Sequence, residues 1–115
     1  MPSSQELRVL FITPEVFPLC KTGGLGDVSA ELPIALRSLQ IDVRLLLPGY
    51  PQVLAGVKYK SKVAEFNELP QFPPATLLSA RLSLSKSEHI PVFVIDCPGL
   101  YHREGGPYMD ALGRD

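Results

Sequence analysis

The amino-acid sequence predicts an α/β domain whose sheet is mostly parallel and is extended by antiparallel strands. Two short apolar runs, residues 7–12 and 41–47, each fit a strand that is buried on both faces. Between them, apolar residues recur at steps of three and four, which is the spacing of one helix face. A strand, a helix and a strand within about 40 residues form a βαβ unit, and this unit places its two strands parallel in one sheet.

The predicted helix begins near the glycines at positions 23, 24 and 26. Asp27 lies in its first turn, where a carboxylate caps the helix or complements the positive end of the helix dipole. The apolar positions form a stripe of the kind that packs on a core. The stripe consists of Leu25, Val28, Leu32, Ala35, Leu36 and Leu39.

The second half of the chain predicts strands of a different kind. Within residues 57–63, the lysines at 58, 60 and 62 alternate with Val57, Tyr59, Ser61 and Val63. This pattern fits a half-exposed edge strand with its lysines outward. Residues 78–85 alternate in the same way, and residues 90–97 form a continuous apolar run that fits a central strand. The short segment 85–89 between these two strands predicts a hairpin.

Residues 1–115 are predicted to form a single domain, because a chain of 115 residues can bury one core. From residue 98 onward the sequence is rich in glycine and polar residues and shows no terminating helix or strand. We interpret the chain as a truncated domain.

Composition and charge exclude several kinds of partner. Lys and Arg number 11 and Asp and Glu 12, so there is no basic excess to attract nucleic acid or an anionic membrane. No run approaches the ~20 apolar residues of a membrane span, and the first residues lack the pattern of an export signal, so we expect a cytoplasmic protein. Cys20 and Cys97 are far apart, and His89 and His102 have no flanking ligands, so no metal or other cofactor is expected.

The most informative stretch, residues 15–28, follows the first strand and opens the helix, where parallel sheets place their ligands. Its glycines allow close approach of backbone N–H groups to an anion, and Lys21 adds a positive charge, so a phosphate is the expected ligand. The spacing matches neither G-x-G-x-x-G nor G-x-x-x-x-G-K-[ST]. On spacing alone, the alternative stays open that the glycines only form a tight turn and that Lys21 is solvated.

The same stretch resembles one family closely. The string K-T-G-G-L-G-D-V at residues 21–28, preceded by T-P-E at 13–15 and followed by L-P-x-A-L at 32–36, is similar to the N-terminal signature of bacterial glycogen synthases and plant starch synthases. The segments D-V-R at 42–44, L-P-x-Y at 47–50 and L-Y-x-R at 100–103 extend the resemblance over nearly the whole chain.

The resemblance implies a retaining GT-B glycosyltransferase, in which two Rossmann-like domains face a cleft. Such an enzyme transfers glucose from ADP-glucose to the non-reducing end of an α-1,4-glucan such as glycogen. This chain is similar only to the start of the N-terminal domain, so its fold is expected to be an incomplete Rossmann-like domain. The second domain, which holds the catalytic groups, would be its partner in cis. No catalytic residue is therefore predicted here, and the chain alone is expected to be inactive.

For the donor, the resemblance implies that Lys21 contacts the phosphates of the nucleotide sugar. It also implies that the backbone of Gly23 and Gly24 faces the diphosphate and the glucose.

Three further residues are candidates for the cleft. The resemblance places Asp27 near the acceptor end, where it could bind a sugar hydroxyl besides capping the helix. Tyr101 could offer its ring to a glucose or cover the core. Glu15 follows the first strand, and for this residue we favour a hydrogen bond to its own loop over contact with substrate.

Two rival functions remain open from the sequence. One is a UDP-glucose-dependent enzyme of the sucrose-synthase type, although those relatives usually vary the K-T-G-G-L-G-D string. The other is a non-catalytic glucan-binding module.

Overall fold

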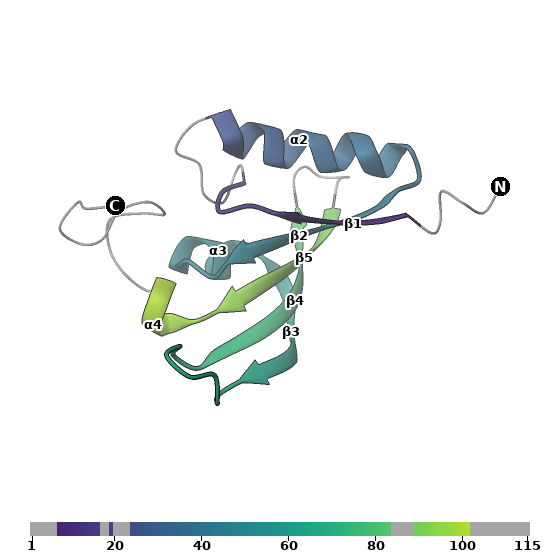
Figure 1. The fold of residues 1–115 in the computed structure, drawn as a ribbon. Helices are drawn as coiled ribbons and strands as arrows, with labels where there is room; N and C mark the ends of the chain where they lie inside the picture. Colours follow the sequence, from purple (N-terminus) through teal and green to yellow (C-terminus); the bar gives the residue numbers. More distant parts are fainter. Residues whose placement is uncertain (1–6, 17–18, 20–23, 84–88, 102–115) are drawn as a thin grey trace.

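The structure, a computed structural model, describes residues 7–16, 19, 24–83 and 89–101 and contains one five-stranded sheet (Figure 1). The strands are β1 (Arg8–Ile12), β2 (Asp42–Pro48), β3 (Lys58–Phe66), β4 (Ala75–Ser83) and β5 (His89–Asp96). Their order in the sheet is β1-β2-β5-β4-β3. The pairs β1–β2 and β2–β5 are parallel, whereas β4 pairs antiparallel with both β5 and β3. The predicted α/β sheet with added antiparallel strands is thus confirmed.

The first crossover connection is helix α2 (Gly24–Ser38), which runs alongside β1 and β2 (Figure 1). Two short helices were not predicted, α3 (Pro51–Gly56) after β2 and α4 (Pro98–Tyr101) after β5. Each begins with a proline, whose fixed φ suits the first helical turn and whose missing N–H is not needed there. Helices of six and four residues have too few turns to show a helical period in the sequence.

The core lies on one face of the sheet. Alternate side chains of β2, β4 and β5 point to this face and pack against Ala30 of α2 and Val53 of α3. In the register, Leu45 of β2 lies between Phe11 of β1 and Val92 of β5. The buried strand residues are Val43, Leu45, Leu47, Ala80, Leu82, Ile90, Val92 and Val94.

The apolar stripe of α2 does not face this core, contrary to the expectation from its spacing. Leu25, Val28 and Leu32 are 45%, 50% and 40% exposed. The buried residues of the helix are instead small or compact, namely Gly26, Ser29, Ala30 and Pro33. Small side chains let the helix backbone approach the sheet closely, and this contact turns the large apolar side chains outward.

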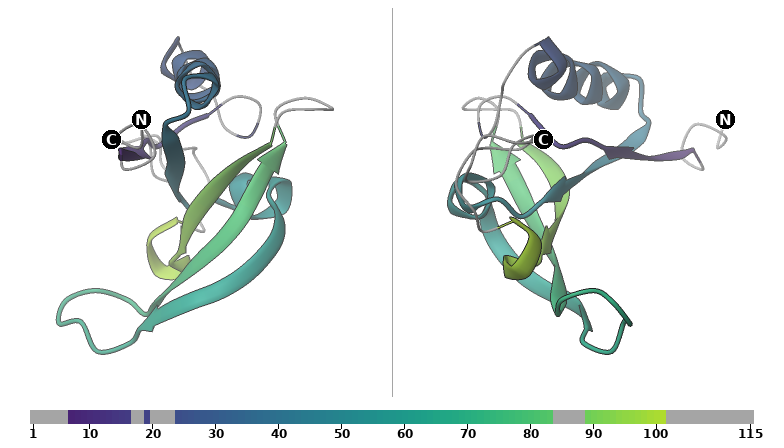
Figure 2. Two further views of the ribbon diagram at one scale, coloured as in Figure 1. Left: turned by 90° about the vertical axis from the view of Figure 1, so that its right-hand side faces the viewer. Right: turned by 60° about the vertical axis from the view of Figure 1, so that its left-hand side comes forward.

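Strand β3 lies at the edge of the sheet as predicted, but its alternation does not produce a buried side. Tyr59 is 79% exposed and Val63 is 54% exposed. Tyr59 has a φ of 59°, and the register with β4 shifts between Lys58 and Ser61 and again between Lys62 and Ala64. These irregularities interrupt the two-residue repeat of the strand. The hairpin that β3 forms with β4 extends away from α2 (Figure 2).

Candidate functional site

The carboxyl ends of the parallel strands β1, β2 and β5 meet at one edge of the sheet, where α/β proteins bind their ligands. Gly49, just after β2, donates its N–H to the carbonyl of Ile95 at 2.8 Å. A Cβ atom at Gly49 would lie 2.6 Å from that carbonyl oxygen and 3.1 Å from the Cα of Asp96. Glycine is therefore required for the two strand ends to lie this close.

A buried polar cluster joins the end of β1 to the start of α2. The Gly26 N–H donates to Glu15 Oε1 at 3.0 Å, and the Thr13 and Ser29 hydroxyl oxygens are 3.0 Å apart. The Thr13 hydroxyl also donates to the Glu15 carbonyl at 2.9 Å, so Ser29 is the donor in the hydroxyl pair. Thr13 and Glu15 are 2% exposed and Ser29 is fully buried.

Leu19 connects the same region to α3. A Cβ atom at Gly56 would collide with the end of the Leu19 side chain, so this leucine lies directly against the last residue of α3. Leu19 also packs against the core cluster. Of the described residues after β1, Glu15 thus contacts α2 and Leu19 contacts α3.

Two tyrosines lie at the ends of β2 and β5. Tyr50 occupies the N-cap position of α3, and Tyr101 ends α4. Burial, and secondarily the nearby Cys97 thiol, raise the pKa of the Tyr101 hydroxyl above 10.0. Tyr101 packs against the core, so the structure shows the covering role that was one of its two predicted roles.

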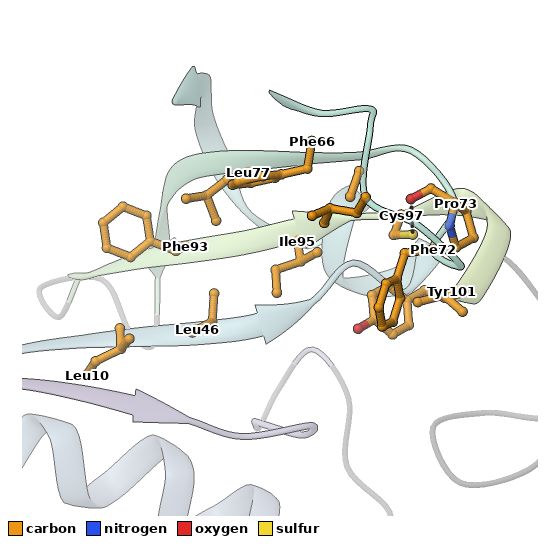
Figure 3. A pocket seen from close by; sticks show the side chains of 13 residues that line it. Leu10, Leu46, Phe66, Phe72, Pro73, Leu77, Phe93, Ile95, Cys97 and Tyr101 are labelled. Carbon is orange, nitrogen blue, oxygen red and sulfur yellow. Dashed lines mark hydrogen bonds between the residues drawn. The ribbon is translucent and has the colours of Figure 1, made fainter. Parts of the chain in front are cut away.

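The opposite face of the sheet forms an apolar pocket of about 580 Å³ (Figure 3). Its wall includes Leu46, Phe93 and Ile95 from the strands, Phe72 from the segment between β3 and β4, and Tyr101 from α4. Apart from the Tyr101 hydroxyl and the Cys97 thiol, the side chains that line it are hydrocarbon. This chemistry does not suit a charged nucleotide sugar, so the candidate site is the carboxyl edge of the sheet.

The predicted site residues fall into three groups. Gly24 is the exposed first residue of α2, and Asp27 lies half-buried in the first turn as expected for an acidic residue near a helix N-terminus. Glu15 is buried, and its carboxylate bonds the backbone of α2 rather than only its own loop. Lys21 and Gly23 lie outside the described residues.

Three residues of this edge were missed, namely Thr13, Ser29 and Tyr50. The T-P-E string directly after β1 was a signal for Thr13, because polar residues at that point of a parallel strand face the ligand edge. Ser29 had no comparable signal, since it lies 16 residues from the hydroxyl that it contacts.

Among the described residues, no three His, Cys, Asp or Glu side chains cluster as metal ligands would. Within the same part of the chain, none of the helices has the length and apolar character needed to span a membrane.

Comparison with known protein families decides the family of the chain. A model of the starch synthase catalytic domain matches residues 8–115. The chain belongs to the starch synthase catalytic domain family. The resemblance seen in its motifs is thereby confirmed.

Curated relatives agree with this family. The chain is 64% identical to the glycogen synthase of Nitrosomonas eutropha, over 100% of the chain and 24% of that protein. It is 60% identical to the glycogen synthase of Nitrosospira multiformis, over 98% of the chain and 23% of that protein. The chain therefore spans about a quarter of the length of these relatives.

A solved structure supports the same fold. The catalytic domain of Starch Synthase IV from Arabidopsis thaliana, bound to ADP and acarbose, matches with a TM-score of 0.61 and 27% sequence identity. The match covers 77% of this chain and 18% of that one.

Proposed function

We propose that this chain is the N-terminal, acceptor-side part of a glycogen synthase. The parent enzyme transfers glucose from ADP-glucose to the non-reducing end of an α-1,4-glucan and retains the anomeric configuration. The observation that carries the proposal is the 64% identity to a bacterial glycogen synthase over the whole chain. The Arabidopsis relative, bound to ADP and acarbose, supports an ADP-linked donor and a saccharide acceptor. On the same family likeness, we propose a cytoplasmic location.

The start of α2 is the part of the chain that meets the donor in this proposal. Gly24 is exposed, and, apart from its chain neighbours and its own helix, the described part of the chain has no atom within 4 Å of where its Cβ would lie. A ligand can therefore approach this backbone closely. Gly23 would face the diphosphate in the same way, and Lys21 would contact the phosphates and stabilise the charge of the leaving group.

Asp27 and Tyr101 are proposed to face the acceptor side of the cleft. Glycosyl transfer also needs the catalytic groups of a second domain, to which no part of this chain is similar. The 115-residue chain alone is therefore expected to bind weakly and not to turn over.

A chimera tests the proposal. In it, this chain replaces the matching segment of the Nitrosomonas eutropha glycogen synthase, and labelled glucose transfer to glycogen is measured from ADP-glucose and from UDP-glucose. A charge-assisted hydrogen bond is worth about 1.5–3 kcal/mol, so Lys21→Ala should lower kcat/KM for ADP-glucose about ten- to 150-fold. The control is Lys62→Ala on β3, which removes an exposed lysine that pairs with Glu65 and should leave kcat/KM unchanged.

Each result has a distinct meaning. Binding of glycogen without transfer from either donor would favour the glucan-binding module. An unchanged kcat/KM in Lys21→Ala would remove Lys21 from the donor site.

A further inference from the structure

We propose that Glu15 is a positioning residue for the donor sugar nucleotide. Its buried carboxylate holds the first turn of α2 in the orientation in which the backbone of Gly24 meets the donor. This inference rests on the function proposed above, because it assigns to Glu15 a role in the same site.

The burial of Glu15 shows that its carboxylate is part of the fold and not a solvated surface group. A carboxylate that is 2% exposed loses its hydration and needs compensating hydrogen bonds or positive charge. The N–H of Gly26 supplies one such bond at 3.0 Å, and the positive end of the α2 dipole lies at the same point. Because Gly26 is the third residue of α2, its N–H has no acceptor within the helix. Glu15 therefore caps the helix.

This cap differs from an ordinary N-cap in where it comes from. An ordinary N-cap residue directly precedes its helix, and it fixes only the local turn. Glu15 lies 11 residues before Gly26, just beyond the end of β1. Its hydrogen bond therefore ties the start of α2 to a strand end of the sheet.

The hydroxyl pair of Thr13 and Ser29 makes a second tie between the same two elements. The Thr13 hydroxyl donates to the Glu15 carbonyl at 2.9 Å and accepts from the Glu15 N–H at 3.3 Å, so it holds the backbone of Glu15. Ser29, one turn further along α2, holds Thr13. Two buried contacts at successive turns of the helix fix both its position and its rotation about its own axis.

The consequence for binding is preorganisation. Donor contacts through the Gly24 backbone need the helix start to stand at a set distance from the strand ends, and a frame that is already ordered lowers the entropy lost on binding. The N–H of Gly26 is already used by Glu15, so the ligand-facing backbone is that of the residues before it. Glu15 thus acts on the donor through Gly26 and α2, without contact to the substrate.

The test compares two substitutions of Glu15 in the chimera. Glu15→Ala removes the acceptor, whereas Glu15→Gln keeps an oxygen at the same reach for the Gly26 N–H. Glu15→Ala should lower kcat/KM for ADP-glucose about tenfold and leave KM for glycogen unchanged, and Glu15→Gln should stay within about threefold of the parent. The matched control is Leu82→Ala, which leaves a cavity next to β4, away from the carboxyl edge. It should lower the melting temperature while kcat/KM stays within about twofold.

Three results would overturn the proposal. The first is a Glu15→Ala chimera that loses stability like Leu82→Ala but keeps its kcat/KM, which would make Glu15 merely structural. The second is a Glu15→Gln chimera as impaired as Glu15→Ala. The third applies if the Glu15→Ala chimera does not fold. Ser29→Ala should then still lower kcat/KM for ADP-glucose about threefold, and an unchanged kcat/KM would overturn the proposal. An inactive chimera without substitutions would instead contradict the proposed function.

Discussion

The rings of Tyr50 and Tyr101 meet edge to face, with their centroids 5.4 Å apart and their planes at 71°. This arrangement brings the positive edge of one ring to the negative face of the other, and such pairs contribute about 0.5–1.5 kcal/mol beyond the area that they bury. Tyr50 follows β2 and Tyr101 follows β5, so the pair joins the segments that leave two neighbouring parallel strands. The contact helps to fix the carboxyl edge at which we place the substrate.

The raised pKa of Tyr101 predicts a loss of stability at alkaline pH. Because its hydroxyl ionises at a higher pH in the folded chain than in the unfolded chain, its contribution is fully present below pH 10.0 and is lost as pH rises through the folded pKa. Urea unfolding between about pH 9 and about pH 12 should therefore show a steeper fall for the unsubstituted chain than for Tyr101→Phe. The phenylalanine keeps the ring contact, so it serves as its own packing control. Equal slopes would show that the hydroxyl titrates alike in both states.

Two glycines should respond in opposite ways to alanine. Gly49→Ala places a methyl group against backbone atoms that cannot move aside, at 2.6 Å from the Ile95 oxygen, and should destabilise the chain by about 1–3 kcal/mol. Gly24→Ala adds its methyl group to open space in a helix and should leave stability unchanged or raise it by up to about 1 kcal/mol. Urea unfolding of both variants measures the difference. A stable Gly49→Ala chain would contradict the close approach of β2 and β5.

The same Gly24→Ala substitution separates stability from function. In the chimera, its methyl group would stand where the donor approaches the backbone, so kcat/KM for ADP-glucose should fall at least about tenfold although the protein is no less stable. Unchanged transfer would mean that the donor does not approach Gly24.

The outward stripe of α2 predicts a small effect for a polar substitution. Leu32 is 40% exposed, so Leu32→Gln should change the free energy of unfolding of this chain by less than about 1 kcal/mol. Leu47→Ala in the core, where the side chain is 1% exposed, should cost about 2–5 kcal/mol. Comparable losses in the two variants would place the stripe against the sheet after all.

The strands of the central sheet could be predicted because their signal is local. The continuous apolar runs at residues 7–12, 41–47 and 90–97 all form strands. The prediction that the run at 7–12 is buried on both faces is wrong, because β1 lies at an edge of the sheet, where Leu10 is 51% and Ile12 is 70% exposed. The glycine-rich stretch between β1 and α2 was also a local signal, but its spacing alone left a tight turn open, and only the resemblance of the whole string to one family favoured a ligand there. The edge position of β3 followed from its lysines, but its exposure on both sides did not, because the bulges depend on the register with β4.

The sequence by itself determined the family and the β1–α2–β2 unit, because each depends on residues that are near one another in the chain. The tertiary structure alone decided which side of α2 is buried, since small residues can approach a sheet more closely than leucines can. It also decided which group the Glu15 carboxylate contacts. A carboxylate next to a glycine-rich loop can face substrate or backbone, and only folding brings Gly26 within 3.0 Å of it.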